Sequence, residues 1–390
     1  MTETLSPQPT SRIELSRSAL SRNLSFIRSE IGHDTLLCSV VKGNAYGHGI
    51  EQFVPLAESL GITHFGVSDS WEAARVLACK SPKTQVMIMA MLRDDETGWA
   101  VANGIEFYVF DLERLKAALA SAEALGRPAR IHIQLETGMH RLGFENGQLE
   151  EVSKLLSESP QAYVLEGLAT HLAGAESITN YHRIQQQLER YDEIVRRFRN
   201  GYAIIGRRHV ASSAAALIYP HAVYDMVRVG VAQYGFWPTK ETRIRYLSTS
   251  ARLTDRPLRR VMSWKSNVMG IKDVERGEFI GYGTTFIAPR PMRIATIPVG
   301  YSHGYSRVLS NQGYVLIRGK RAHVIGLVNM NMMTVDVTNV SDVERGDEVV
   351  IIGTQRNQTI TVGSFSEMTN QLNYELLARL PECIPREVVS

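Results

Sequence analysis

The sequence predicts a (β/α)8 barrel followed by a C-terminal all-β domain. Eight short apolar runs alternate with amphipathic helical stretches, and beyond Pro238 short strands separated by turns replace them. A chain of 390 residues is also too long for one ordinary core. An open doubly wound sheet would alternate in the same way. It usually needs fewer units, however, and no Gly-x-Gly-x-x-Gly follows the first strand of the alternating region.

The chain is expected to divide into three segments. Residues 1–11 are polar and rich in Pro and Ser, and they form an N-terminal extension that could join the β domain. Residues 12–245 would form the barrel and residues 246–390 the β domain. The stretch 239–260 between them is charged and rich in arginine, without long periodicity.

Periodicity predicts the elements in chain order. Ile13 begins a strand, and apolar residues at helical spacing over 18–31 predict the first helix. The barrel-strand candidates are Leu36–Val41, His64–Val67, Val86–Met91, Ile105–Phe110, Arg130–Leu135, Val164–Ala169, His209–Ala211 and Met226–Ala232. Helices are expected between them at Ser70–Ala78, Leu112–Leu125, Leu149–Leu156 and Asn180–Phe198. In the β domain, Val349–Ile352 is one of the clearer strands, and a final helix covers residues 362–380.

Composition excludes several classes of protein. A hydrophobic content of 44% and a net charge of +3 give no support for nucleic-acid or membrane binding. The chain has only three cysteines, an odd number, which argues against a disulfide framework. No Cys/His cluster in the sequence has metal-ligand spacing. The first residues lack the features of a secretory signal, and no apolar run would span a bilayer. We therefore expect a cytoplasmic protein without a metal.

One lysine stands at the end of the first barrel strand. The apolar run ends at Lys42, where Gly43, Gly47 and Gly49 predict a tight turn before a helix that starts near Ile50. Backbone amides and a helix N-terminus at such a place suit a phosphate. A lysine beside them can form a Schiff base with an aldehyde if burial lowers its pKa. From position alone, a solvated lysine at a strand end remains the alternative.

The ten residues Val-Val-Lys-Gly-Asn-Ala-Tyr-Gly-His-Gly around Lys42 closely resemble the pyridoxal-phosphate lysine motif of alanine racemases. Further similar words follow in the same order, and the resemblance covers the chain from Ile13 to Arg386. These words are Thr137-Gly-Met-His-Arg-Leu-Gly-Phe, Thr170-His171, Ser212-Ser213, Arg228-Val-Gly230, Gly281-Tyr-Gly-Thr-Thr-Phe286, Ile297-Pro-Val-Gly-Tyr301 and Asn373-Tyr-Glu375.

The resemblance implies a racemase that interconverts L- and D-alanine by two-base proton transfer on a pyridoxal-phosphate aldimine. D-alanine of this origin is a peptidoglycan precursor. The resemblance further implies a head-to-tail homodimer and a small amino acid as substrate. Lys42 and Tyr282 would be the two bases, with Tyr282 supplied in trans by the other subunit. A tyrosine has an ordinary pKa near 10, so Tyr282 needs cationic neighbours to act as a base.

The same resemblance assigns the remaining site residues. Arg228 is expected to face the pyridine nitrogen, where an arginine cannot release its proton and so leaves the ring a weaker electron sink. The cofactor-binding set would be Lys42, Tyr46, His171, Ser213, Arg228, Gly230 and Val231. The substrate-binding set would be Arg141, Tyr301, Asn329 and Met330.

The chain departs from the family pattern at four positions. Gln134 replaces a lysine that is often carbamylated, and its amide could still orient Arg141 without charge. Asn329 lies where cysteine is commoner, Glu382 where a tyrosine usually contacts the phosphate, and Ser212 where asparagine is common. Because two of these positions line the pocket, a racemase of broader specificity or a serine racemase stays open.

Two other classes share the barrel and the cofactor. A non-catalytic pyridoxal-phosphate carrier lacks a β domain and an opposing tyrosine, so residues 246–390 and Tyr282 argue against it. A related decarboxylase usually places an acidic residue at the pyridine nitrogen and a cysteine in the site. Arg228 argues against that class.

Overall fold

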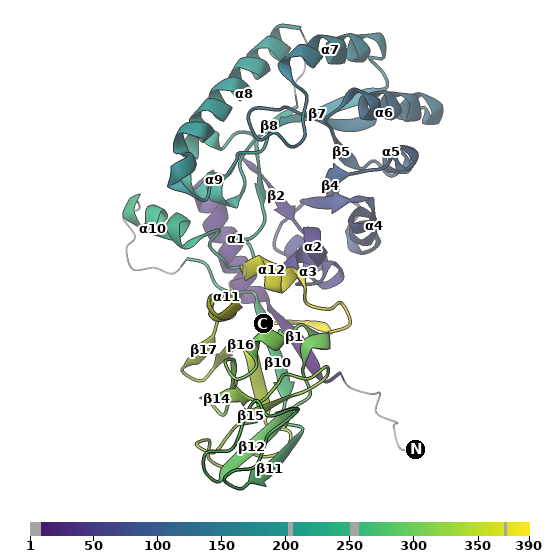
Figure 1. The fold of residues 1–390 in the computed structure, drawn as a ribbon. Helices are drawn as coiled ribbons and strands as arrows, with labels where there is room; N and C mark the ends of the chain where they lie inside the picture. The colour runs from purple at the N-terminus through teal and green to yellow at the C-terminus, as the bar shows by residue number, and fades with distance from the viewer. Residues whose placement is uncertain (1–8, 202–205, 250–256, 370–372) are drawn as a thin grey trace. The chain divides into compact units, whose positions relative to one another are not determined.

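The computed structural model describes residues 9–201, 206–249, 257–369 and 373–390. The chain forms two compact units. The barrel unit contains residues 18–43 and 53–259, and the sheet unit contains the N-terminal strand with residues 44–52 and 260–390 (Figure 1). Within the described residues, no helix is long and apolar enough to cross a bilayer.

Eight parallel strands form the barrel, in the order β8-β7-β6-β5-β4-β3-β2-β9. They are β2 (Leu36–Val40), β3 (His64–Asp69), β4 (Gln85–Met91), β5 (Glu106–Val109), β6 (Ala129–Gln134), β7 (Tyr163–Ala169), β8 (Arg207–His209) and β9 (Met226–Val229). All eight predicted strands are present, within a few residues at their ends, and the predicted fold class is confirmed.

The ring is nearly closed between β8 and β9. These two strands form no regular ladder. Instead, the N–H of Asp225 donates to the carbonyl of Arg208 at 3.1 Å, and the N–H of Arg228 donates to the carbonyl of Ala211 at 3.0 Å. A parallel bridge also pairs Ser212 with Arg228. The closure therefore lies beside the predicted cofactor residues.

Helices surround the barrel strands (Figure 1). They are α1 (Arg17–Ile31), α3 (Ile50–Glu58), α4 (Ser70–Cys79), α5 (Thr97–Ala102), α6 (Leu112–Leu125), α7 (Leu149–Glu158), α8 (Tyr181–Gly201), α9 (Ser213–Ile218) and α10 (Lys240–Thr249). Asp69 and Asp111 cap α4 and α6 by accepting backbone N–H groups at 2.9 and 2.8 Å. Short 3-10 turns occur at Asp94–Glu96, Asn146–Gln148, Ile178–Asn180, Pro220–Ala222, Tyr301–His303 and Arg307–Leu309.

Helix α10 lies in the stretch for which the sequence showed no long periodicity. Most of its residues are charged or polar, so an apolar stripe is weak. Tertiary contacts hold it instead: the ring of Tyr246 packs edge-on against Phe26, and its hydroxyl donates to Glu30 at 2.8 Å. The structure therefore adds a helix that the sequence analysis missed.

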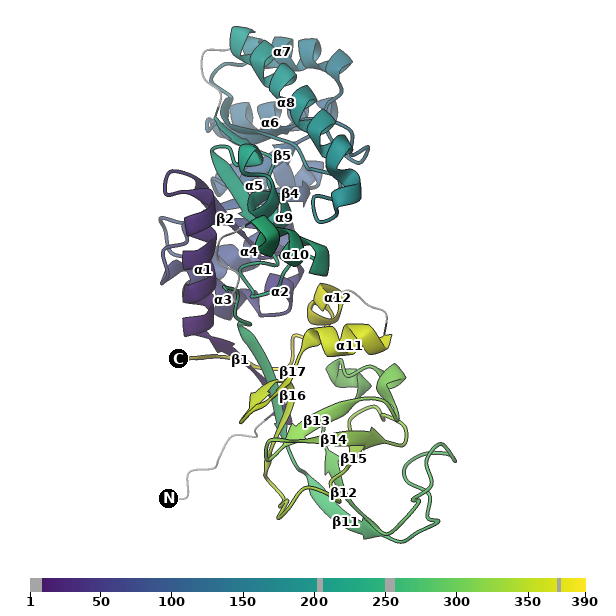
Figure 2. The same cartoon turned by 90° about the vertical axis from the view of Figure 1, so that its left-hand side faces the viewer.

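The sheet unit is built on a mixed sheet that has ten strands among the described residues (Figure 2). Nine lie in the order β11-β12-β15-β14-β13-β16-β10-β1-β18, and β17 pairs with β16. The strands are β1 (Ser11–Ser16), β10 (Met262–Asn267), β11 (Gly270–Val274), β12 (Met292–Ile297), β13 (Tyr314–Ile317), β14 (Lys320–Ile325), β15 (Met333–Asp336), β16 (Glu348–Gln355), β17 (Gln358–Ile360) and β18 (Arg386–Val389).

The N-terminal strand lies inside this sheet. β1 pairs antiparallel with β10 and parallel with β18, so it brings Ile13 and Leu15 into the core beside Trp264. The helix expected over 362–380 is helical in its described parts up to Ala378, as α11 (Val362–Thr369) and α12 (Asn373–Ala378). Residues 370–372 of that expected helix lie outside the described residues.

Candidate active site

The strand that leads to Lys42 is fixed by buried polar contacts. The carbonyl of Val40 accepts from the amide of Gln233 at 3.0 Å and from the hydroxyl of Tyr234 at 2.9 Å. The N–H of Val41 donates to Gly66 on β3 at 2.8 Å. Lys42 follows directly, so its backbone starts from a rigid strand end. Sequence reasoning missed Gln233, because an isolated glutamine in an apolar region carries no motif.

The turn after Lys42 is left-handed. The short helical turn α2 (Lys42–Tyr46) has φ values of +62° at Gly43 and between +52° and +53° at Asn44, Ala45 and Tyr46. This conformation costs about 1–2 kcal/mol for each residue other than glycine. Hydrogen bonds offset part of that cost: the side chain of Asn44 accepts from Ile50 at 3.0 Å, and its carbonyl accepts from Gly49 at 2.9 Å. The predicted tight turn is therefore a strained, well-tethered one.

Glu72 holds the barrel end of this turn. Its carboxylate accepts the N–H of Gly43 at 2.5 Å and that of Ser68 at 2.9 Å. Glu72 lies in the first turn of α4 and is almost fully buried. A negative charge is thus placed beside the backbone of Lys42. Sequence reasoning missed Glu72, since an acidic residue at a helix start usually serves only the helix.

Lys42 has a pKa lowered from its ordinary value of 10.5. Loss of surrounding water is the main cause, and the positive charge of Arg141 is the second. Glu72 acts in the opposite direction, and Arg228 adds to the lowering. Lys42 as a whole residue is exposed at the barrel mouth of the single chain. A larger fraction of its amine is therefore neutral, and able to attack an aldehyde, than in a free lysine.

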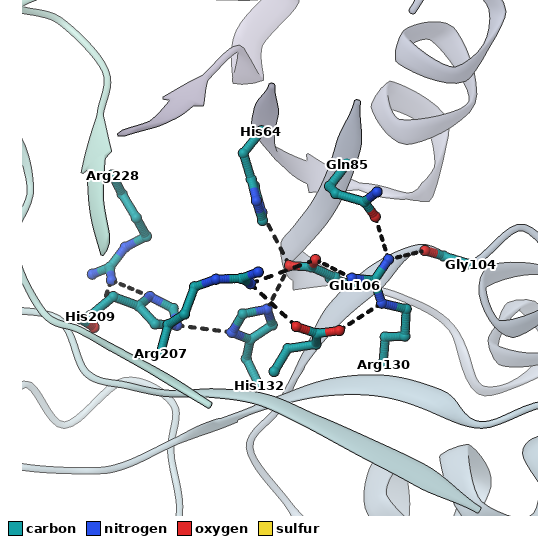
Figure 3. Close-up of polar contacts among 10 residues, drawn as sticks. His64, Gln85, Gly104, Glu106, Arg130, His132, Arg207, His209 and Arg228 are labelled. Atoms are coloured by element: carbon teal, nitrogen blue, oxygen red, sulfur yellow. Dashed lines mark hydrogen bonds and ion pairs between the residues drawn. The ribbon is translucent and has the colours of Figure 1, made fainter. Parts of the chain in front are cut away.

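Arg228 on β9 points into the barrel and is buried (Figure 3). Its Nη1 donates to Nδ1 and to the carbonyl of His209, both at 2.8 Å. Its Nη2 donates to the carbonyls of Thr170 and Val210 at 2.8 and 3.1 Å. A guanidinium has five N–H groups, so these bonds use four. Among the described residues the Nε–H has no acceptor, and one donor of fixed direction is left for a ligand.

His171 follows β7 at the same end of the barrel. Burial is the main cause that lowers its pKa to about 3, and the charges of Arg228, Arg141 and Lys42 add to it. The ring is therefore neutral near pH 7. The preceding residue, Thr170, fixes the strand end by donating its hydroxyl to the carbonyl of Leu135 at 2.9 Å.

Ser213, Gly230 and Val231 meet where β9 ends and α9 begins. The hydroxyl oxygen of Ser213 accepts the N–H of Gly230 at 3.0 Å. The N–H of Val231 has no acceptor among the described residues. One serine hydroxyl and one backbone amide are thus available to an anion here, whereas the amide of Gly230, also in the predicted set, already donates to Ser213.

Arg141 lies on a loop that follows β6. The carboxylate of Glu136 accepts the N–H groups of Met139 and His140, both at 2.8 Å, and so shapes the loop. Gln134 donates its amide to the carbonyl of Leu142 at 3.0 Å, while its Oε1 is buried without a donor in the described part of the chain. The guanidinium of Arg141 is exposed and makes no hydrogen bond to any described residue. It is free to bind a carboxylate.

The sheet unit carries the other predicted residues. Tyr282 is 71% exposed, between Gly281 and Gly283, whose φ values of +80° and +70° favour glycine. Backbone bonds join the two loops that hold Tyr301, Asn329 and Met330. In them, the N–H of Tyr301 donates to Asn329 at 3.0 Å, and that of the next residue, Ser302, donates to Met330 at 2.9 Å. These three predicted pocket residues are therefore neighbours.

Tyr46 also belongs to the sheet unit, where its ring lies 6.5 Å from that of Tyr374. A residue that the sequence analysis did not assign, Arg386, holds this turn by donating from Nη2 to the carbonyl of Gly47 at 3.0 Å. A Cβ at Gly47 would meet the carbonyl oxygen of Leu377 at 1.9 Å. Glycine is required there for space as well as for its φ of +79°. Glu382 is exposed, and its carbonyl accepts from Arg386 at 3.0 Å.

The barrel site is electropositive. Three cations, Lys42, Arg141 and Arg228, influence one another, and Glu72 is the carboxylate that opposes them at Lys42. Such a site favours a ligand with negative charge. The site fits a phosphorylated aldehyde with a ring nitrogen. Lys42 can bind the aldehyde, the free Nε–H of Arg228 the ring nitrogen, and Ser213 with Val231 the phosphate.

Comparisons with known proteins agree with this geometry. A family model described as "Alanine racemase, N-terminal domain" matches residues 15–238, and "Alanine racemase, C-terminal domain" matches residues 261–388. The alanine racemase of Leptospira interrogans is 34% identical over 97% of this chain and 95% of its own. The solved alanine racemase of Clostridium difficile 630 superposes with a TM-score of 0.89 at 26% identity, covering 98% of this chain and 97% of that one.

A third comparison concerns the fold. The alanine racemase of Bartonella henselae, whose structure has covalently bound pyridoxal phosphate, superposes with a TM-score of 0.81 at 22% identity. It covers 98% of this chain and 100% of that one.

Proposed function

The chain belongs to the alanine racemase family, and from this premise we propose that Lys42 and Tyr282 are the two bases with which it interconverts L- and D-alanine. The family makes it a pyridoxal-phosphate-dependent amino-acid racemase acting on a small amino acid. The single observation that carries the assignment of residues is Lys42. It stands at the end of a barrel strand with a lowered pKa, amid cations that favour an anionic cofactor.

The cofactor would be held by residues of the barrel unit and by Tyr46. Lys42 would bind its aldehyde carbon, and the Ser213 hydroxyl with the backbone amide of Val231 would bind its phosphate. The amide of Gly230 donates to Ser213 at 3.0 Å, so it would hold Ser213 in place beside the phosphate. His171, neutral near pH 7, would lie beside the ring. When bound, pyridoxal phosphate supplies an electron sink that makes the α-proton of an amino acid acidic.

Arg228 would direct its Nε–H toward the pyridine nitrogen. The other four N–H groups of its guanidinium are already used, which supports this atom as the contact. An arginine keeps its proton at any working pH, so it can donate to the nitrogen without protonating it. Arg228 would thus leave the bound ring a weaker electron sink than a carboxylate would, which would favour return of the proton over other outcomes.

Proton transfer on both faces of the α-carbon requires two groups on opposite sides. Lys42 would remove or deliver the proton on one face, and Tyr282 on the other. The 71% exposure of the Tyr282 ring within one chain supports a role toward a second subunit. We therefore propose a homodimer in which Tyr282 acts in trans.

The substrate carboxylate would bind Arg141, whose guanidinium makes no bond to any described residue. The buried Oε1 of Gln134 would accept from Arg141 and so orient it without adding a charge. Tyr301, Asn329 and Met330 would line the pocket. We also propose a cytoplasmic location, which the sparse and odd-numbered set of three cysteines fits.

The direct test is to load purified protein with pyridoxal phosphate, add L-alanine and measure D-alanine by chiral chromatography. Lys42→Ala serves as the control for background exchange. We expect D-alanine to form until the two enantiomers are about equal. No D-alanine above the Lys42→Ala background would contradict the proposal.

A racemase of broader specificity is the second candidate. The side-chain amide of Asn329 makes no hydrogen bond to any described residue, so it could bind a polar substrate side chain. This candidate predicts turnover of serine as well as alanine.

A further inference from the structure

We propose that Glu106 and His132 are positioning residues for Arg228 and act through His209. This inference rests on the proposed role of Arg228 toward the pyridine nitrogen. It concerns a buried row of side chains inside the barrel, which the sequence analysis did not assign.

The row runs across four strands (Figure 3). Arg228 on β9 donates to Nδ1 of His209 on β8 at 2.8 Å. Nε2 of His209 lies 2.9 Å from Nδ1 of His132 on β6, and Nε2 of His132 lies 2.9 Å from Glu106 Oε2 on β5. Glu106, His132 and His209 have no exposed surface. An unbroken hydrogen-bonded chain therefore joins a carboxylate to the guanidinium.

The chemistry of the first residue fixes every proton in the row. An arginine is always a donor, so Nδ1 of His209 must be the unprotonated nitrogen. A neutral His209 then carries its proton on Nε2 and donates it to Nδ1 of His132. His132 in turn carries its proton on Nε2 and donates it to the carboxylate of Glu106. One tautomer of each histidine satisfies the whole row, and the other places two donors face to face.

The charge states agree with this direction. Burial opposes ionisation of Glu106, but contacts from His132 and His64 outweigh it and hold the pKa of the carboxyl far below its usual range. Burial lowers the pKa of His132 despite Glu106, and burial followed by the charge of Arg228 lowers that of His209. Glu106 is thus ionised and both histidines are neutral near pH 7.

Gly167 on β7 makes room for the row. Strand β7 lies between the strands of His132 and His209. A Cβ at Gly167 would lie 2.7 Å from Nδ1 of His132 and 3.0 Å from Nε2 of His209, where their hydrogen bond runs. A side chain at residue 167 would push the two rings apart, so the hydrogen bond between His132 and His209 requires glycine there.

Other groups hold Glu106 in place. Nη2 of Arg130 lies 2.9 Å from Oε1, and Nε2 of His64 lies 3.1 Å from Oε2. Arg207 is 3.9 Å from Oε1. Oε1 of Glu166 lies 2.7 Å from Nε of Arg130, so the guanidinium of Arg130 pairs with two carboxylates, those of Glu106 and Glu166. The row therefore has a rigid, charged anchor at the end remote from Arg228.

The row of side chains fixes the orientation of the Arg228 guanidinium. The carboxylate polarises both imidazoles, which strengthens Nδ1 of His209 as an acceptor for Arg228. Two N–H groups of the guanidinium are then held by His209, and the free Nε–H keeps a single direction. Loosening this hold would let Arg228 turn, and the pyridine nitrogen would lose its fixed donor.

Two substitutions test the row, with one matched control. In Glu106→Gln the amide must turn an N–H₂ group toward either His132 or Arg130, and both are donors in the present arrangement. His132→Leu cuts the row without adding a polar group. The control is His64→Gln, which alters a buried histidine at the same oxygen of Glu106 but outside the path to Arg228.

We expect kcat for alanine to fall about ten- to hundredfold in Glu106→Gln and His132→Leu, the usual effect of removing a partner behind a ligating group. KM should change little, since Arg141 still binds the carboxylate. The visible absorption band of the cofactor-loaded protein should shift, and more pyruvate should form per racemisation. Equal losses in His64→Gln, or unchanged spectra with a uniform loss of activity, would overturn the proposal.

A second measurement is read from the wild-type protein, and a variant serves only to assign its signals. Nitrogen-15 spectra of histidine-labelled wild-type holoenzyme, with His209 assigned by comparison with His209→Gln, report which ring nitrogen is protonated. We expect the proton on Nε2. A proton on Nδ1, or on both nitrogens, would overturn the row. If the wild-type protein fails to racemise alanine, the proposed function fails, while the tautomer result still decides the row.

Discussion

The hydroxyl oxygen of Ser213 accepts the backbone N–H of Gly230 at 3.0 Å, which ties the first residue of α9 to the residue that follows β9. The oxygen acts as an acceptor in this bond, so its own proton is available to donate. A phosphate placed beside it would receive that proton. The neighbouring Ser212 precedes the helix without a capping bond from its side chain.

Replacing Ser213 by alanine should therefore weaken cofactor binding. A hydrogen bond to a charged group contributes about 1.5–3 kcal/mol, so the apparent dissociation constant of pyridoxal phosphate should rise about ten- to hundredfold. Absorbance titration of the apoprotein measures it. Ser212→Ala is the matched control and should change the constant little. The same increase in both variants would show that Ser213 does not contact the phosphate.

The pH dependence of cofactor attachment should report the pKa of Lys42. Only the neutral amine attacks an aldehyde, so the rate of attachment to apoprotein should rise with pH. The midpoint of this rise should lie below pH 10.5, and the rate should level off above it. Arg141 lowers the pKa of Lys42 and Glu72 raises it. Arg141→Gln should therefore move the midpoint up, and Glu72→Gln should move it down.

Stopped-flow absorbance with pyridoxal phosphate gives these midpoints. Borohydride reduction followed by peptide mapping identifies the lysine that carries the label. A label on any lysine other than Lys42, or shifts of the same sign in both variants, would contradict the assignment.

Strand positions were predictable because apolar runs recur with helical stretches between them. The fold of the barrel follows from that alternation, and Lys42 and Arg228 follow from family motifs. The left-handed conformation of the turn after Lys42 could not be predicted, because Asn44, Ala45 and Tyr46 adopt positive φ values although none is glycine. Periodicity carries no information about the sign of φ.

The row of buried side chains was also beyond sequence reasoning. His132 lies between Ile131 and Ile133, and all three are fully buried. Both faces of a parallel barrel strand are covered, so apolar alternation cannot show which residue points into the barrel. The contact between His132 and His209 further depends on the lack of a side chain at Gly167. His132, Gly167 and His209 lie on three different strands, so no local sequence pattern could show that they meet.

The proposed sharing of Tyr282 between subunits predicts complementation. Lys42→Ala and Tyr282→Phe should each be inactive, because each removes one of the two bases. Heterodimers formed by mixing them contain one site with both bases intact, so racemisation should return to at most about half of the wild-type rate per heterodimer. Subunit exchange is verified by native mass spectrometry. No recovery after demonstrated exchange would show that both bases come from one chain.

The last prediction concerns the substrate pocket and Asn329. The backbone of Asn329 is fixed, since its N–H donates to Met332 at 2.9 Å and its carbonyl accepts from Tyr301 at 3.0 Å. Its side-chain amide, in contrast, is half-buried and unbonded among the described residues. By the sequence resemblance, Glu382 is expected where a tyrosine usually narrows the pocket. We therefore expect alanine as the main substrate, with measurable racemisation of serine.

Comparison of kcat/KM for alanine, serine, lysine and arginine decides this prediction, together with two variants. Asn329→Ala should lower kcat/KM for serine about tenfold while that for alanine changes little, because only serine offers a hydroxyl to the amide. Asn331→Ala is the matched control, since its amide already donates to Ser302 at 3.0 Å. It should affect both substrates alike. Serine at background in the wild-type protein would reject the wider pocket and leave the racemase assignment intact.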